Sequence, residues 1–202
     1  MGRRNDHKRE DLRTLALAAA RRIMAAEGVR GLTARRLARE IGYSPGTLYN
    51  MFENLDEVAL RVNAGLLDEL HGRLAAALAS QPDAPAALRA MARAYMDCAR
   101  AEPGLWNALF EHQLGEGRPL PDWYEGRITR LFRLAEEVLA PLFGPGGEEA
   151  CHRSARVLWS ALQGISSLAL ARKLDPLAQL PAEVMADDLV DTYLAGLAAR
   201  RA

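Results

Sequence analysis

Few side chains in this sequence combine types and spacings that suit metal binding. Glu149 and His152 form a Glu-x-x-His pair, and Asp68 with His71 forms a similar pair. Di-iron helical bundles need two true Glu-x-x-His copies and two further glutamates that face inward. Glu149 also follows a Gly-Pro-Gly-Gly turn, where the first turn of a helix explains an acidic residue better. We therefore predict no metal site and no cofactor.

Catalytic nucleophiles are equally hard to find. Neither Cys98 nor Cys151 lies in a motif that marks a reactive thiol, and two cysteines cannot form a zinc ribbon by themselves. The Gly-Pro-Gly-Gly turn lacks the preceding strand and the following lysine of a phosphate-binding loop. No Ser-His-Asp signature is recognisable. The residues favour a protein that is not an enzyme, and a helical enzyme stays open as an alternative.

The charged side chains are distributed unevenly along the chain. Its 26 basic and 26 acidic residues cancel, but residues 1–50 hold eleven basic and five acidic groups, a net charge of +6, so the other 152 residues carry −6. A basic segment joined to an acidic one indicates a polyanionic partner for the basic segment. A solvated basic surface is the alternative.

The composition predicts an all-α protein. Half of the residues are apolar, alanine and other helix-favouring residues dominate, and no segment alternates with period two. No apolar run reaches the roughly 18 residues of a membrane span, and the charged N-terminal segment has no signal-peptide core. We expect a cytoplasmic protein with no membrane partner.

Apolar residues at helical spacing predict three helices in the basic segment, at 10–28, 34–41 and from Pro45 onward. Gly28 is expected to end the first helix in a left-handed conformation, and Gly42 to end the second. Thr33 and Ser44 are expected to cap the second and third helices. The three-residue connection predicts a helix-turn-helix. The side chains expected to face inward are Leu12, Leu15, Ala16, Ala19, Ile23, Ala26, Leu37, Ala38, Ile41, Leu48 and Phe52.

The inward positions leave a polar outer side on the third helix. A helix of this kind fits the major groove of DNA, where hydroxyl and amide groups bond to base edges. The Tyr49 hydroxyl is placed to reach a phosphate, as are Arg35 and Arg36 at the amide end of the second helix. The outward residues are Pro45, Gly46, Thr47, Tyr49 and Asn50.

Helical periodicity continues to the end of the chain. Including the first three, we predict about nine helices, divided between an N-terminal helix-turn-helix domain, 1–53, and a C-terminal helical bundle, 54–202. Asn54 and Glu57 indicate a capping box at the start of the fourth helix. The later helices are predicted at 54–79, 84–101, 103–113, 122–142, 147–173 and 182–200.

The segment LTARRLAREIGYSPGTLYNMFENLDEVAL, 32–60, resembles the DNA-binding domain of the tetracycline-repressor (TetR) family of bacterial regulators. Many members carry a lysine that meets a phosphate where this chain has Leu55, so the basic arm of Arg3, Arg4, Lys8 and Arg9 gains importance. The resemblance implies contacts between duplex DNA and Thr33, Arg35, Arg36, Tyr43, Ser44, Pro45, Gly46, Thr47, Tyr49 and Asn50.

Two later segments resemble a TetR subgroup with a WHG-type C-terminal domain. They are Pro103-Gly104-Leu105-Trp106 and the run 158–164, which has Gln163 where the named motif has histidine. The resemblance implies a homodimer through the last two long helices, with apolar stripes that could instead face their own core. It also implies a cavity for a moderately hydrophobic organic effector. Its candidate lining residues are Tyr95, Trp106, Phe110, Trp123, Phe132, Trp159 and Gln163.

Together these features predict a ligand-responsive transcriptional regulator. We expect a repressor that binds a palindromic operator as a dimer and is released when an effector moves the long fourth helix. A DNA-binding regulator without a small-molecule effector is the main alternative.

Overall fold

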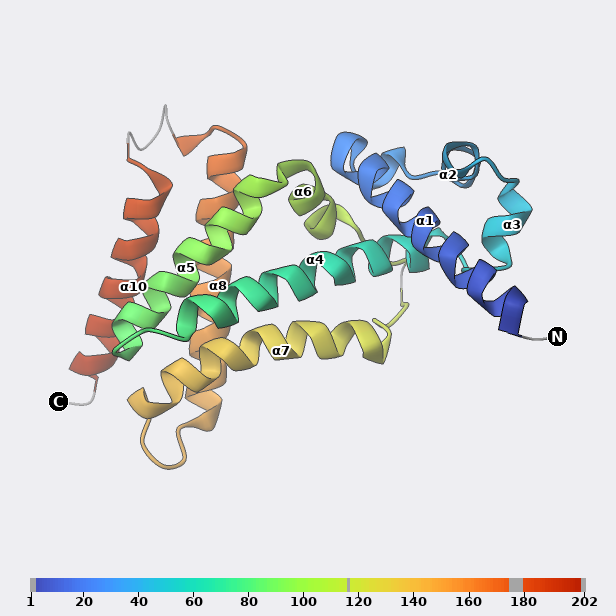
Figure 1. The fold of residues 1–202 in the computed structure, drawn as a ribbon. Helices are drawn as coiled ribbons and strands as arrows, with labels where there is room; N and C mark the ends of the chain where they lie inside the picture. The colour runs from blue at the N-terminus through green and yellow to red at the C-terminus, as the bar shows by residue number, and fades with distance from the viewer. Residues whose placement is uncertain (1–2, 116, 175–179, 201–202) are drawn as a thin grey trace. The chain divides into compact units, whose positions relative to one another are not determined.

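Helices are the only regular secondary structure in the described part of the chain. The computed structural model describes residues 3–115, 117–174 and 180–200, and this part contains nine α-helices, two 3₁₀ turns and no strand (Figure 1). The all-α prediction is confirmed. The helices are α1 (Arg3–Glu27), α2 (Ala34–Ile41), α3 (Pro45–Tyr49), α4 (Leu55–Leu78), α5 (Ala84–Ala101), α6 (Pro103–Glu111), α7 (Asp122–Leu139), α8 (Glu148–Leu170) and α10 (Ala182–Ala199), and the 3₁₀ turns are Val29–Gly31 and Ala140–Leu142.

The helix bounds follow the local sequence closely. α2 and α5 span the predicted residues, 34–41 and 84–101. α1 begins at Arg3, earlier than predicted, because the arginine and lysine residues that precede Glu10 are good helix formers. α7 gives way to a 3₁₀ turn at Ala140, next to Pro141, which cannot donate a backbone hydrogen bond.

Two glycines shape the turns on either side of α2. Gly42 has φ 76° and ψ 27°, the left-handed conformation expected there, and the Tyr43 N–H donates to the carbonyl of Ala38 at 2.9 Å. Gly28 also has a positive φ, 68°, but its ψ of −172° leads into a 3₁₀ turn. The predicted left-handed cap at Gly28 is therefore wrong in ψ, although both conformations favour glycine.

The first of two compact units contains residues up to Leu66 together with Glu102–Tyr124. α6 packs against α1 so closely that a Cβ atom at Gly104 would overlap the carbonyl oxygen of Ala25. Leu15 and Ala26 are exposed, so the prediction that they face inward is wrong: the buried side of α1 is rotated toward Ala20 and Met24. The fully buried side chains here include Ala16, Ala19, Met24, Leu37, Val58, Leu105 and Trp106.

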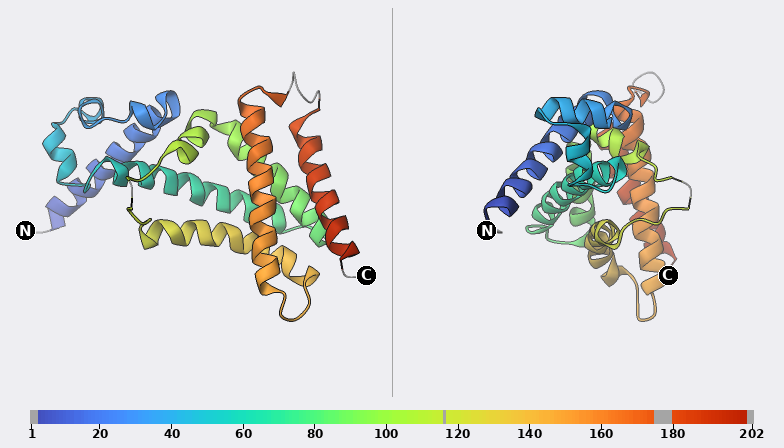
Figure 2. Two further views of the ribbon diagram at one scale, coloured as in Figure 1. Left: turned by 180° about the vertical axis from the view of Figure 1, so that it is seen from behind. Right: turned by 90° about the vertical axis from the view of Figure 1, so that its right-hand side faces the viewer.

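The second compact unit contains Leu67–Ala101 and the chain from Glu125 onward. α8 and α10 run beside each other, and both pack on α5 (Figure 2). Three ion pairs join α5 to α10, with Arg93 Nη2 lying 2.6 Å from Asp187 Oδ2. The other two pairs are Arg89–Asp191 and Arg100–Glu183. The core of this unit includes Leu88, Ala92, Met96, Leu139, Ala155, Ala186 and Val190.

The apolar stripe predicted for dimerisation on α8 consists of Ala155, Leu158, Leu162, Ile165 and Ala169, and all five belong to this core or pack against it. Ala155 is buried, and Leu158, Leu162, Ile165 and Ala169 pack against the same cluster. The exposed apolar side chains of α8 lie elsewhere on the helix, so the alternative that the stripe faces its own core is the better description.

No described helix is both long enough and apolar enough to cross a membrane. The two compact units are defined by packing and do not show what each part of the chain does. The functional division between residues 1–53 and 54–202 therefore stays a prediction.

Candidate nucleic-acid interface

The third helix is short and presents most of its side chains to solvent. Leu48 is 2% exposed and fixes α3 on the core of the first unit, whereas Tyr49 is 56% exposed. Tyr43, just before α3, is 51% exposed. Thr47 is half-buried, and its hydroxyl lies 3.1 Å from that of Ser44. Ser44 occupies the cap position as predicted, although its side chain makes no capping bond to the backbone.

Pro45, Gly46 and Asn50 are also exposed, so nearly all of the predicted outward residues of α3 lie on its free side. The exposed groups are a phenol, an amide and a glycine backbone that no side chain covers. An α-helix with such a surface fits the major groove and can bond to both base edges and phosphates.

The amino end of α2 is capped as predicted. Thr33 Oγ1 accepts a hydrogen bond from the backbone N–H of Arg36 at 3.3 Å. Arg35 is exposed, whereas the Arg36 guanidinium is paired with the carboxylate of Glu27, and this bond raises the pKa of Arg36. A phosphate at this end of α2 would meet the exposed Arg35 and would compete with Glu27 for Arg36.

Two arginines of α1 bind the carbonyl groups that follow α3. Arg9 Nη2 donates to the carbonyl of Asn50 at 2.6 Å, and Arg13 Nη1 donates to that of Met51 at 2.7 Å. The last carbonyls of a helix have no partner inside the helix. The sequence reasoning placed Arg9 in a phosphate-binding arm and missed Arg13. The side chains of residues 3–8, and with them the predicted arm contacts of Arg3, Arg4 and Lys8, lie outside the described residues.

The start of α4 is tied to the same region. The N–H of Glu57 donates to Asn54 Oδ1 at 2.8 Å, which confirms the predicted cap. Glu57 Oε2 accepts from the N–H of Glu53 at 2.7 Å, one residue before the usual capping-box donor. Burial raises the pKa of Glu57, but the bonds from Glu53 and Arg61 outweigh it, so the pKa lies below its ordinary value.

Both parts of the chain match known protein families. Bacterial regulatory proteins of the tetR family match over residues 16–62, and the tetracyclin repressor-like C-terminal domain matches over residues 88–193, more than half of the chain. The chain belongs to the TetR family. It is a transcriptional regulator with a DNA-binding domain near its N-terminus.

Individual relatives agree with this membership. An uncharacterised HTH-type transcriptional regulator of Mycobacterium tuberculosis is 29% identical over 177 residues, which cover 86% of this chain and 76% of that protein. A protein of unknown function from Rhodococcus sp. RHA1 is 25% identical, with a TM-score of 0.75 over 92% of this chain and 94% of that one. A TetR variant from Acinetobacter baumannii, solved in complex with minocycline, is 18% identical, with a TM-score of 0.63 over 93% of this chain and 96% of that one, and shares the fold.

Four of the seven candidate effector residues of this TetR-family chain meet in the second unit. The Tyr95 hydroxyl donates to Gln163 Oε1 at 2.6 Å and is also hydrogen-bonded to the side chain of Trp159. The Phe132 ring meets Trp159 edge-on, with 5.6 Å between ring centroids. Burial raises the pKa of Tyr95 well above its ordinary value. A buried hydroxyl beside an amide and two aromatic rings offers one side of a ligand both polar and apolar contacts.

The other three candidates lie in the first unit. Trp106 is 1% exposed, and its ring lies 5.6 Å from that of Phe110. Trp123 is covered by the guanidinium of Arg61, 5.0 Å from the ring centroid. The seven side chains therefore do not form one cluster within either unit.

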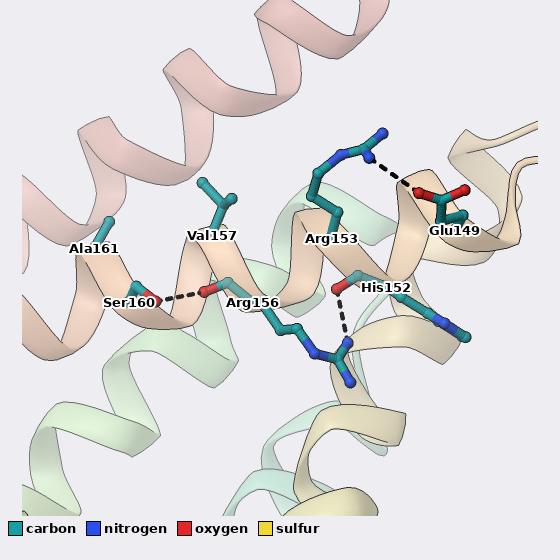
Figure 3. A pocket seen from close by; sticks show the side chains of 7 residues that line it. All are labelled: Glu149, His152, Arg153, Arg156, Val157, Ser160 and Ala161. Carbon is teal, nitrogen blue, oxygen red and sulfur yellow. Dashed lines mark hydrogen bonds and ion pairs between the residues drawn. The ribbon is translucent and has the colours of Figure 1, made fainter.

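A groove that the sequence analysis missed runs along α8. In Figure 3, Val157 and Ala161 project from one side of the helix and Arg156 from the other. None of the seven candidates lines it. Its lining residues are Glu149, His152, Arg153, Arg156, Val157, Ser160 and Ala161.

Each residue of the Glu-x-x-His pair on α8 contacts a partner other than the second member of the pair. Glu149 Oε1 lies 3.4 Å from Arg153, and His152 Nε2 lies 3.7 Å from Glu136. Among the residues that the structure describes, no three His, Cys, Asp or Glu side chains gather in a way that could hold a metal ion.

Proposed function

We propose that this chain is a homodimeric repressor that binds a palindromic operator and is released by a small-molecule effector. The observation that carries the proposal is the outward-facing surface of α3, on which Tyr49 and Asn50 are exposed while Leu48 anchors the helix. The proposed DNA contacts are Thr33, Arg35, Arg36, Tyr43, Ser44, Pro45, Gly46, Thr47, Tyr49 and Asn50.

The side-chain chemistry divides these residues into two groups, those that bond to bases and those that bind phosphates. Thr47 and Asn50 carry the hydroxyl and amide groups that bond to base edges, so they are proposed to read sequence. Tyr49, Arg35 and Arg36 are proposed to bind phosphates and fix the position of the helix on the duplex. Residues 1–53 then form the DNA-reading part, and residues 54–202 serve the effector and the dimer.

A palindromic operator requires a reader with two-fold symmetry. Val157, Ala161, Gly164 and Leu168 follow one another at helical spacing on α8, and Val157 and Leu168 are 47% and 45% exposed. These apolar residues, together with exposed Val184 on α10, are the proposed contact between two copies. Small residues at the middle of the stripe favour a close approach of two helices.

The effector is proposed to contact the cluster of Tyr95, Phe132, Trp159 and Gln163. Its aromatic rings suit an apolar body, and its hydroxyl and amide suit one polar group, so the expected ligand is a moderately hydrophobic organic molecule. Trp106, Phe110 and Trp123 remain predictions for the same role. The minocycline complex of the Acinetobacter baumannii relative supports an organic effector for this chain.

The deciding experiment is selection of bound fragments from random and genomic duplex DNA by the full-length protein. The proposal predicts an enriched inverted repeat and an affinity that falls as salt rises. Thermal shift of the full-length protein against a metabolite panel then tests the effector. A hit that also releases the operator supports the repressor, an absence of hits favours a regulator without an effector, and enrichment of no DNA sequence contradicts the proposal.

A further inference from the structure

The guanidinium of Arg13 bridges the connection between α3 and α4, beside the bond from Arg9 to the carbonyl of Asn50. Arg13, on α1, donates through Nη1 to the carbonyl of Met51 at 2.7 Å and through Nη2 to Glu57 Oε1 at 3.0 Å. Its guanidinium carbon also lies 4.7 Å from the centroid of the Phe52 ring. One planar group thus contacts the residues that follow α3 and the first turn of α4.

Glu57 is the second half of this connection. Its Oε1 accepts from Arg13 and from Arg61 Nε, at 3.0 and 2.7 Å, and its Oε2 accepts from the N–H of Glu53 at 2.7 Å. The side chains of Arg13 and Glu57 are only 22% and 20% exposed. Hydrogen bonds to a charged group are shorter and stronger than neutral ones, and a half-buried ion pair is screened less than an open surface pair.

We propose that Arg13 and Glu57 are positioning residues that set the orientation of α3 for DNA and carry a displacement of α4 to α3; this inference rests on the proposed function. α3 has five residues and a single buried side chain, so its own packing constrains it weakly. The guanidinium fork constrains it further because Met51 and Glu57 must be reached at the same time. A shift of the first turn of α4 then moves the carbonyl that follows α3.

The direction in which Glu57→Gln changes the affinity for DNA distinguishes a positioning role from a purely electrostatic one. Glu57→Gln removes an acidic charge near the proposed interface, so electrostatics alone predicts tighter DNA binding. Loss of positioning predicts weaker binding. The glutamine retains an oxygen that accepts from the N–H of Glu53, so the cap of α4 and the fold are retained.

The test measures binding of the wild-type protein, Glu57→Gln and Arg13→Gln to the duplex that the wild type selects, at several salt concentrations. Arg153→Ala, which removes an exposed arginine from the second unit, is the matched control. All measurements are made well below the melting temperature of each variant, where a pair that only stabilises the fold would leave the affinity unchanged. Amide hydrogen exchange of residues 45–53 is followed in the same proteins without DNA.

We expect both glutamine variants to bind the duplex about tenfold more weakly, in line with the loss of charge-assisted bonds. The slope of log affinity against log salt concentration should equal that of the wild type, and amide exchange at residues 45–53 should be faster. Arg153→Ala should match the wild type. Wild-type or tighter binding by Glu57→Gln overturns the inference, as does a salt slope reduced by about 0.9 in Arg13→Gln, which would make Arg13 a phosphate contact. If the wild type selects no duplex, the proposed function fails, and unchanged exchange at residues 45–53 then overturns the inference separately.

Discussion

The hydroxyl of Tyr95 on α5 donates a 2.6 Å hydrogen bond to Oε1 of Gln163 on α8. The two residues lie 68 positions apart in the sequence, and Tyr95 is only 5% exposed. The same hydroxyl is hydrogen-bonded to the side chain of Trp159. Three side chains proposed to meet the effector therefore already share one polar network, and a ligand that bonds to Gln163 would have to displace or extend it.

Removing the hydroxyl tests this network. Tyr95→Phe should lower the free energy of unfolding by about 1–2 kcal/mol, because the amide oxygen of half-buried Gln163 loses its donor. Urea unfolding measures the change. Tyr43→Phe is the matched control, since the Tyr43 side chain is 51% exposed and the substitution should change stability by less than about 0.5 kcal/mol. Equal losses in the two variants would contradict the importance of the network.

Buried phenols make stability depend on alkaline pH. Burial raises the pKa of Tyr124 to about 12, whereas an unfolded tyrosine titrates near about 10. Between these values the unfolded chain loses the proton while the folded chain keeps it, so the free energy of unfolding falls as pH rises. Urea unfolding at a series of pH values should show a shallower fall for Tyr124→Phe than for the wild type. Identical pH dependence in the two proteins would rule this explanation out.

Tyr49 is exposed enough to be replaced without harm to the fold. Tyr49→Ala should leave the melting temperature unchanged and weaken operator binding about tenfold, the loss of one or two hydrogen bonds. Fluorescence anisotropy on the selected duplex measures the affinity. Tyr49→Phe distinguishes the contribution of the hydroxyl from that of the ring. If Tyr49 binds a phosphate through its hydroxyl, Tyr49→Phe should weaken DNA binding as Tyr49→Ala does. Undiminished binding by Tyr49→Ala would remove this residue from the interface.

Gly104 should be intolerant of even one methyl group. Gly104→Ala would place a Cβ on the Ala25 carbonyl oxygen, so α6 must move away from α1, at a cost of about 1–3 kcal/mol in unfolding free energy. Gly72→Ala is the matched control, since no atom lies within 4 Å of the added Cβ and alanine favours a helix interior by about 1 kcal/mol. In thermal unfolding, Gly104→Ala is expected to lower the melting temperature and Gly72→Ala to raise it. A stabilised Gly104→Ala would mean that the two helices do not approach so closely.

The sequence predicts the helix-turn-helix well because its signals are local. Thr33 bonds to an N–H three residues away, and Gly42 permits a turn that depends only on its own φ and ψ. Leu48 separates the buried from the exposed side of α3 through helical spacing alone. Each of these features is determined within about five residues of the chain.

The remaining features depend on contacts between distant residues. Arg13 meets Glu57 across 44 positions, and nothing near either residue distinguishes this arginine from its exposed neighbours. Leu15 fits the apolar pattern of α1 yet lies in solvent, because other elements decide how much of the helix is covered. Residue type alone marks the effector candidates in the sequence, and it does not reveal that Trp106 and Tyr95 belong to different compact units.

The central claim is that the exposed surface of α3 reads duplex DNA. Selection from a fully randomised duplex pool by the wild-type protein, repeated with Asn50→Ala, tests it most directly. We predict that the wild type enriches an inverted repeat whose half-sites lie one helical turn or a multiple apart, and that Asn50→Ala loses the preference at defined base pairs of each half-site. A wild-type pool that enriches no sequence, or an Asn50→Ala pool that enriches the identical sequence with equal affinity, would contradict the claim.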